Sequence, residues 1–89
     1  MINLIWDDAF KRKYKKLIKN NEFLKNIFWK KIELFIDNPY NPQLKTHKLS
    51  GKLKNCYSFA LGFDFRVVFQ FVDNESVLLI DIGSHDEVY

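Results

Sequence analysis

The sequence has little cysteine, glycine and proline. Its 89 residues include one cysteine, Cys56, with three glycines and two prolines. A single cysteine cannot form an internal disulfide, and it has no partner at the spacing of a zinc site, so a disulfide scaffold and a cysteine-based metal site are excluded. A lone thiol on an apolar stretch is typical of a buried structural cysteine. The sequence therefore predicts a protein of the reducing cytoplasm.

Long hydrophobic runs and a secretory leader are also missing. No apolar run approaches the roughly 20 residues that a membrane helix needs, and the N-terminal residues lack the basic-then-apolar order of a signal peptide. We therefore expect no association with a membrane. The 47% of hydrophobic and 17% of aromatic residues are enough to form a core, and the length predicts a single domain over residues 1–89.

Acidic residues are absent between Asn38 and Phe63. The basic residues of this stretch are Lys45, His47, Lys48, Lys52 and Lys54. Although the net charge of the whole chain is only +3, this stretch is predicted to attract an anion. A second basic cluster, at residues 11–19, falls in a helical pattern and is interpreted as a solvated helix face.

The first half of the chain predicts a strand and two helices. Ile2, Leu4 and Trp6 alternate as in a short strand with one fully buried face. Apolar residues then recur at three- and four-residue spacing, which predicts amphipathic helices over residues 8–19 and 24–36. The second helix is expected to stop at Asn38-Pro39, and the residues from there to 51 are predicted to be an irregular segment suited to binding.

The second half predicts three strands, at residues 54–61, 65–72 and 76–82. Short connections at residues 62–64, which include Phe63, and at residues 73–75 indicate an antiparallel meander. The element order is then β-α-α-β-β-β. It predicts an α+β fold in which a helical hairpin packs on one face of a small twisted, mainly antiparallel sheet. The edge at which the first strand joins this sheet stays open.

Arg66 alternates out of an otherwise apolar strand. Phe65, Val67 and their alternate neighbours share one face, so Arg66 projects from the other face, which the helices are expected to leave freer. A guanidinium group offers a rigid fork of donors that matches phosphate oxygens. We interpret Arg66 as a phosphate-binding residue. The alternatives are a strand cation on a solvated face, or a cation paired with Asp64 or Asp81.

The chain has only two histidines, His47 and His85. RNA is cleaved without a metal ion when its 2′-hydroxyl attacks the adjacent phosphorus, which requires a base, an acid and a cation. Histidine suits the proton transfers because it titrates near neutral pH. His47 lies in the basic segment and His85 follows the last strand, so the two can meet at one end of the sheet. The alternative for His85 is a surface histidine in a frayed tail, and the alternative for His47 is an incidental loop histidine near Pro42 and Lys45.

The last residue of the sequence is Tyr89. Its ring is expected either to dock on the domain or to stack on a base, as aromatic rings do in the recognition of single-stranded RNA, and either use orders the tail. Asp86 and Glu87 supply too few ligands for a metal site, and no pattern for another cofactor is present. The lysines predicted to hold backbone phosphate are Lys45, Lys48, Lys52 and Lys54.

The chain resembles toxins of the RelE superfamily, closest to the RelE/YafQ branch, over nearly its whole length. The resemblance rests on the element order, on His47-Lys48-Leu49-Ser50-Gly51, on the strand Asp64-Phe65-Arg66-Val67-Val68-Phe69 and on the ending Gly83-Ser84-His85-Asp86-Glu87-Val88-Tyr89. It implies the toxin of a type II toxin–antitoxin system, an mRNA interferase that cuts mRNA in the ribosomal A site. A cognate antitoxin would hold it inactive, and the complex would bind the operator DNA through the antitoxin.

The resemblance also implies site residues, carried over position by position. These are the loop histidine His47, Asp64 at the start of the middle strand, the strand arginine Arg66, His85 after the last strand and the C-terminal aromatic Tyr89. In the family such residues surround the scissile phosphate. The chain departs from the pattern at Tyr57-Ser58-Phe59-Ala60, where a further histidine is common. Either Arg66 and the loop lysines compensate, or cleavage is slow.

Two other functions fit the same scaffold. A toxin similar to ParE would inhibit DNA gyrase and need no catalytic histidine. A remnant that only binds an antitoxin would use the basic segment to hold an acidic peptide. The presence of His85 in the ending favours the endoribonuclease.

Overall fold

The structure, a computed structural model, describes residues 1–62 and 64–89. The side chain of Lys52, a predicted phosphate-binding residue, and Phe63, in the first predicted connection, lie outside this description. The elements are β1 (Asn3–Trp6), α1 (Asp8–Ile18), α2 (Glu22–Asp37), η1 (Pro42–Leu44), β2 (His47–Lys48), η2 (Gly51–Leu53), β3 (Tyr57–Gly62), β4 (Phe65–Phe71), β5 (Ser76–Ser84) and α3 (His85–Val88). The predicted order β-α-α-β-β-β is confirmed, with β2, α3 and two 3-10 turns (η1 and η2) in addition.

Side chains cap the first turns of α1 and α2. The N–H of Ala9 donates to Asp7 at 3.1 Å, and the N–H of Leu24 donates to Asn21 at 3.0 Å. Such contacts satisfy N–H groups that have no partner inside a helix. α2 ends directly before Asn38, as the following proline predicts. Both helices begin and end within two residues of their predicted bounds.

The five strands form one sheet in the order β1-β5-β4-β3-β2. β1 runs parallel to β5, and every other pair is antiparallel, so the predicted mainly antiparallel sheet is confirmed. The first strand therefore joins the edge formed by β5. The prediction that β1 has a fully buried face is wrong: Leu4 and Trp6 are only half-buried, because an edge strand has a neighbour on one side alone.

The strands in and after the basic segment differ in part from the prediction. His47 and Lys48 pair with Ser58 and Tyr57 of β3, so His47 lies in a short edge strand and not in a loop. β3 begins at Tyr57, three residues late, because a 3-10 turn begins at Gly51, whose φ of +69° suits glycine. β5 continues two residues beyond its predicted end, to Ser84. This extension brings the C-terminal residues back onto the sheet.

The core lies between the sheet and the helical hairpin. Val67 and Phe69 of β4 are fully buried, as their alternation predicts. The centroid of the Phe35 ring on α2 lies 4.9 Å from the ring centroid of Phe59 and 4.9 Å from that of Phe69. Such aromatic contacts stabilise the packing of α2 on β3 and β4 beyond the burial of area.

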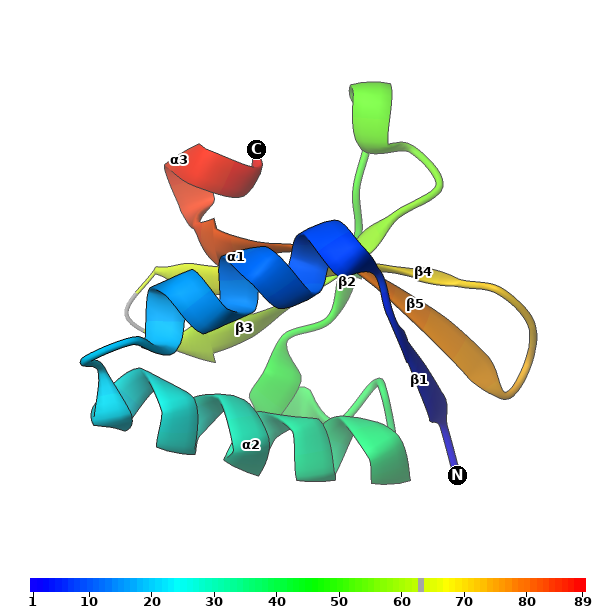
Figure 1. The fold of residues 1–89 in the computed structure, drawn as a ribbon. Helices are drawn as coiled ribbons and strands as arrows, with labels where there is room; N and C mark the ends of the chain where they lie inside the picture. Colours follow the sequence, from blue (N-terminus) through cyan, green and yellow to red (C-terminus); the bar gives the residue numbers. More distant parts are fainter. Residues whose placement is uncertain (63) are drawn as a thin grey trace.

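The opposite face of the sheet is not left free. Figure 1 shows α2 on one side of the sheet, with α3 and the segment around η2 on the other. The expectation that the helices leave this face open holds for α1 and α2 but misses α3. Within the described residues, no helix has both the length and the apolar character needed to cross a membrane.

Candidate active site

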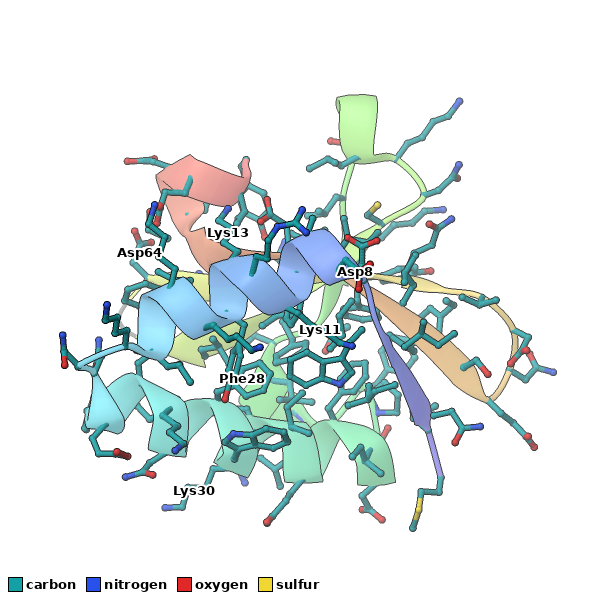
Figure 2. The ribbon with its side chains drawn as sticks, in the orientation of Figure 1. Asp8, Lys11, Lys13, Phe28, Lys30 and Asp64 are labelled. Atoms are coloured by element: carbon teal, nitrogen blue, oxygen red, sulfur yellow. The ribbon has the colours of Figure 1, made fainter. Side chains whose placement is uncertain are left out.

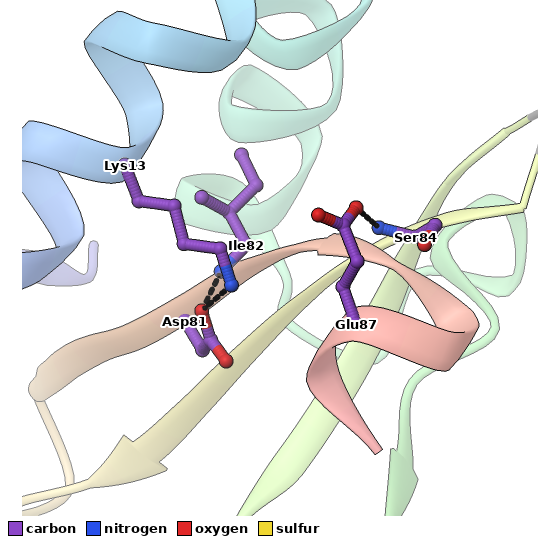
Figure 3. A network of polar contacts seen from close by, with 5 residues as sticks. All are labelled: Lys13, Asp81, Ile82, Ser84 and Glu87. Atoms are coloured by element: carbon purple, nitrogen blue, oxygen red, sulfur yellow. Dashed lines mark hydrogen bonds and ion pairs between the residues drawn. The ribbon is translucent and has the colours of Figure 1, made fainter.

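Residues 85–88 form one helical turn, so the ending is not a frayed tail. The N–H of Ser84 donates to Glu87 Oε1 at 2.9 Å (Figure 3), and this bond together with the Ser84 hydroxyl lowers the pKa of the Glu87 carboxyl from its ordinary value. The N–H of His85 donates to the carbonyl oxygen of Asp64 at 2.9 Å. The start of α3 is therefore attached to the turn before β4.

Gly83 and Val88 place α3 against the sheet. A Cβ atom built on Gly83 would lie 3.2 Å from Glu87 Cβ and 3.4 Å from Val88 Cγ1, so only glycine allows this approach without a shift. Val88 is 8% exposed. Since Gly83 is paired with Arg66 of β4, and paired residues project to the same face, α3 covers the face that carries Arg66.

Arg66 lies between two small residues of the neighbouring strands. It pairs with Ala60 on β3 and with Gly83 on β5, and its own side chain is half-buried. Within residues 1–62 and 64–89, no hydrogen bond or ion pair involves its guanidinium group. Asp81, one alternative partner, instead binds Lys13 of α1 at 2.6 Å (Figure 3). The donors of Arg66 are thus available beside α3.

Tyr89 docks on the domain, one of the two uses predicted for it. Its hydroxyl forms a hydrogen bond with the hydroxyl of Ser58 on β3, and its N–H donates to the carbonyl oxygen of His85 at 3.1 Å. Its ring stands at 89° to the His85 imidazole, with centroids 4.5 Å apart. Nδ1 of His85 lies 3.6 Å from Oδ1 of Asp86, which is too far for a hydrogen bond, and the side chain of Asp86 is fully exposed. Tyr89 is therefore the main neighbour of the imidazole.

His47 is brought to the same part of the sheet by β2. It is directly opposite Ser58, and such pairs have Cβ atoms about 4.5–5.5 Å apart on one face. Its Nδ1 lies 3.2 Å from the carbonyl oxygen of Lys45. A carbonyl oxygen only accepts, so Nδ1 is the donor, and Nε2 of a neutral ring is left as an acceptor. The pairing with Ser58 thus connects the two histidines through Tyr89.

A cleft of about 630 Å³ opens between α3 and the segment around η2. Its walls are formed by Leu49, Ser50, Leu53, His85, Val88 and Tyr89. Apolar walls with a few polar groups are typical of ligand pockets of this size. The cleft can hold a flat, partly apolar group against the imidazole of His85 and the ring of Tyr89.

A family model of known proteins matches residues 2–89, and its description is "Bacterial toxin of type II toxin-antitoxin system, YafQ". The chain belongs to the YafQ family. A comparison with curated proteins gave no match.

Solved structures of toxins have the same fold as this YafQ-family chain. A metal-bound toxin from Helicobacter pylori is 30% identical, with all of both chains covered and a TM-score of 0.80. YafQ from E. coli is 15% identical, with 100% of this chain and 99% of that chain covered and a TM-score of 0.81. The YafQ chain of the E. coli DinJ–YafQ complex is 15% identical over the same shares, with a TM-score of 0.79. The two E. coli structures show likeness of fold.

The other predicted site residues that the structure describes do not line this cleft, and Lys48 projects from the face opposite His47, because neighbouring residues of a strand alternate between faces. Asp64 has a left-handed backbone, with φ of +71°, and an exposed side chain, and it contacts α3 through its carbonyl group. Lys45, Lys48 and Lys54 are exposed, and none of these three side chains lines the cleft. Among the described residues, no three His, Cys, Asp or Glu side chains are grouped so that they could hold a metal ion.

The sequence patterns single out neither Ser58 nor the packing roles of Gly83 and Val88. Ser58 interrupts an apolar strand, as Arg66 does, and that break in the pattern was the available signal. Val88 lies in a helical turn too short for a periodic pattern, and Gly83 lies near the end of β5. Their roles follow only from the docking of α3 on the sheet.

Proposed function

We propose that this YafQ-family toxin is an mRNA interferase, which cleaves mRNA on the ribosome by attack of the RNA's own 2′-hydroxyl. The observation that carries the proposal is the placement of Arg66, His85, Tyr89 and His47 on one face of the sheet, beside an open cleft. Three elements far apart in the sequence contribute to this cluster. It contains the base, acid and cation that such a reaction requires.

In the reaction, the 2′-oxygen bonds to phosphorus and the bond from phosphorus to the 5′-oxygen breaks. One histidine takes the proton of the 2′-hydroxyl, and the other gives a proton to the leaving 5′-oxygen, so the products are a 2′,3′-cyclic phosphate and a 5′-hydroxyl. His47, with Nε2 as an acceptor, suits the first role, and His85 in the cleft suits the second. No step needs a metal ion.

The other residues bind the RNA. Arg66 stabilises the negative charge that gathers on the phosphate in the transition state. Tyr89 presents one side of its ring in the cleft, where a base can stack on it. Asp64 positions α3 through its carbonyl group, and the exposed Lys45, Lys48 and Lys54 hold phosphates of the flanking nucleotides. The same role is assigned to Lys52.

A cognate antitoxin is proposed as the protein partner, because the family is that of type II toxin–antitoxin systems and a relative was solved as a DinJ–YafQ complex. The antitoxin would hold the toxin inactive and carry the complex to operator DNA. The toxin would act in the cytoplasm, where ribosomes and mRNA are found.

The proposal is tested with purified translating ribosomes and a defined mRNA. His85→Ala is expected to lower the single-turnover rate of cleavage by about 10²- to 10⁴-fold, the usual contribution of a general acid or base. Arg66→Ala is expected to lower it by about 10²- to 10³-fold. The matched control is Lys30→Ala, which removes one positive charge from α2 on the side away from α3 (Figure 2). This variant should cleave mRNA at the wild-type rate.

Several results would overturn the proposal. One is cleavage by His85→Ala at the wild-type rate. The other is intact mRNA together with gyrase-dependent DNA breaks, which would assign the toxin to the mechanism of gyrase inhibitors. Intact mRNA and intact DNA in cells that produce the wild-type protein without an antitoxin would identify an inactive remnant.

A further inference from the structure

Ser58 is a polar side chain in the interior of the molecule. Its exposed fraction is 0%, and among the residues that the structure describes it is the one buried polar or charged residue. Burying a hydroxyl without a partner costs free energy, so buried hydroxyls are normally hydrogen-bonded. The partner of Ser58 is the hydroxyl of Tyr89, the last residue of the chain. A residue of a central strand thus holds the end of the chain.

The position of Ser58 in the sheet is well fixed. β3 has β4 on one side and β2 on the other, and Ser58 pairs with Val68 and with His47. Val68 is 1% exposed. Interiors are close-packed, so a hydroxyl at this position has little freedom to move. Ser58 therefore offers Tyr89 a rigid point of attachment.

Tyr89 in turn orients His85. The side chain of His85 is 51% exposed, so the body of the protein encloses it only partly. The Tyr89 ring lies perpendicular to the imidazole at 4.5 Å, within the range of favourable aromatic contacts. An exposed imidazole changes rotamer freely unless a neighbour restrains it. Tyr89 restrains the imidazole only while its own ring is held in place.

We propose that Ser58 is a positioning residue: through the hydroxyl of Tyr89 it fixes the ring that orients the His85 imidazole for proton transfer. This inference rests on the proposed function and adds to it a residue that does not touch RNA. A misplacement of about 1 Å in a reacting group lowers a rate by about 10²-fold. The chain from Ser58 through Tyr89 to His85 is where such a misplacement would arise.

A purely structural role for Ser58 makes different predictions. If Ser58 only stabilised the tail, loss of its hydroxyl would lower stability without changing the surroundings of His85 in the folded protein. If Tyr89 acted only by stacking on a base, Tyr89→Phe would keep full activity, because the ring remains. The positioning role instead requires the hydroxyl itself.

The test uses four variants of the full chain: Ser58→Ala, Tyr89→Phe, the double variant, and Ser76→Ala. Ser76 is half-buried at the start of β5, away from α3, and provides the same substitution as a control. The first measurement is the NMR signal of the His85 ring protons in the free protein, which the neighbouring Tyr89 ring shifts. The second is single-turnover cleavage of mRNA on ribosomes, with the rate and the half-saturating toxin concentration measured separately.

Ser58→Ala and Tyr89→Phe are each expected to change the His85 ring signals in the same direction. Each should lower the cleavage rate by about 10- to 100-fold, with little change in the half-saturating concentration. The double variant should be no slower than either single variant, because the two residues act through one contact. Ser76→Ala should match the wild type in both measurements.

Unchanged His85 signals in Ser58→Ala would overturn the inference, and so would changed signals with a wild-type rate of cleavage. Additive losses in the double variant would also overturn it, because they would mean that Ser58 acts independently of Tyr89. The NMR measurement needs no RNA. If the wild-type protein cleaves no mRNA, the proposed function fails, whereas the effect of Ser58 on His85 is still decided by the ring signals.

Discussion

Val88 anchors α3, and its truncation should release the C-terminal turn while the rest of the fold stays intact. Val88 is 8% exposed, so Val88→Ala removes two nearly buried carbon groups. At about 0.8 kcal/mol for each, docking of α3 should weaken by about 1.6 kcal/mol, before any cost of a cavity. This corresponds to a roughly 15-fold larger population of undocked α3.

The amide hydrogen of Tyr89 reports this opening directly, because its acceptor, the carbonyl oxygen of His85, lies in α3. Its exchange with deuterium, measured by NMR, should accelerate about 15-fold, while the amide of Phe69 in β4 should be unaffected. Val72→Ala is the matched control, because Val72 is 56% exposed after β4 and should leave both rates unchanged. An unchanged rate at Tyr89 would refute the anchoring role of Val88. Equal acceleration at Phe69 would refute the separate opening of α3.

Three further predictions concern titratable groups. Partial burial raises the pKa of the Cys56 thiol, so iodoacetamide at pH 8 should alkylate it more slowly than it alkylates a model peptide. Equal rates would contradict this effect of burial. Burial also raises the pKa of Tyr14, and the indole N–H of Trp29, which donates to the Tyr14 hydroxyl at 2.8 Å, partly offsets this rise. Trp29→Phe should therefore raise the pKa of Tyr14 further. A lower pKa of Tyr14 in this variant, measured by NMR, would contradict the role given to the hydrogen bond. The pKa of Glu87 is lowered, so its stabilisation of α3 is present above the pKa of the unfolded chain and is lost as the pH falls through the lower folded value. Protection of the Tyr89 amide should fall over that range in the wild type but not in Glu87→Gln, and the same pH dependence in both would rule out the carboxylate.

Much of the fold could be predicted because its elements have strong periodic patterns. The helices carry apolar residues at three- and four-residue spacing with capping residues at Asp7 and Asn21, and the face of β4 follows from strict alternation. The pairing of β1 with β5 could not be predicted, because parallel pairing of distant strands depends on tertiary packing. β2 was missed because two residues are too few for an alternating pattern.

The residues of the candidate site could be predicted, but the contacts that hold them together could not. Arg66 and the two histidines stand out by residue type, and the resemblance to toxins of the RelE superfamily placed them in one site. The contact between Ser58 and Tyr89 has no sequence signal, since it joins residues 31 positions apart. The close approach of α3 at Gly83 likewise depends on the register of β4 and β5.

The proposed function requires that the face formed by Arg66, His47, His85 and Tyr89 cleaves RNA through the RNA's own 2′-hydroxyl. The most direct measurement compares two mRNAs on the same ribosomes, identical except that the nucleotide 5′ to the mapped break is 2′-deoxy in one of them. The wild-type toxin should cut the all-ribose mRNA to a 2′,3′-cyclic phosphate and leave the deoxy position uncut. Cleavage at the deoxy position, or a product that ends in a free 3′-hydroxyl, would contradict the proposed 2′-hydroxyl attack.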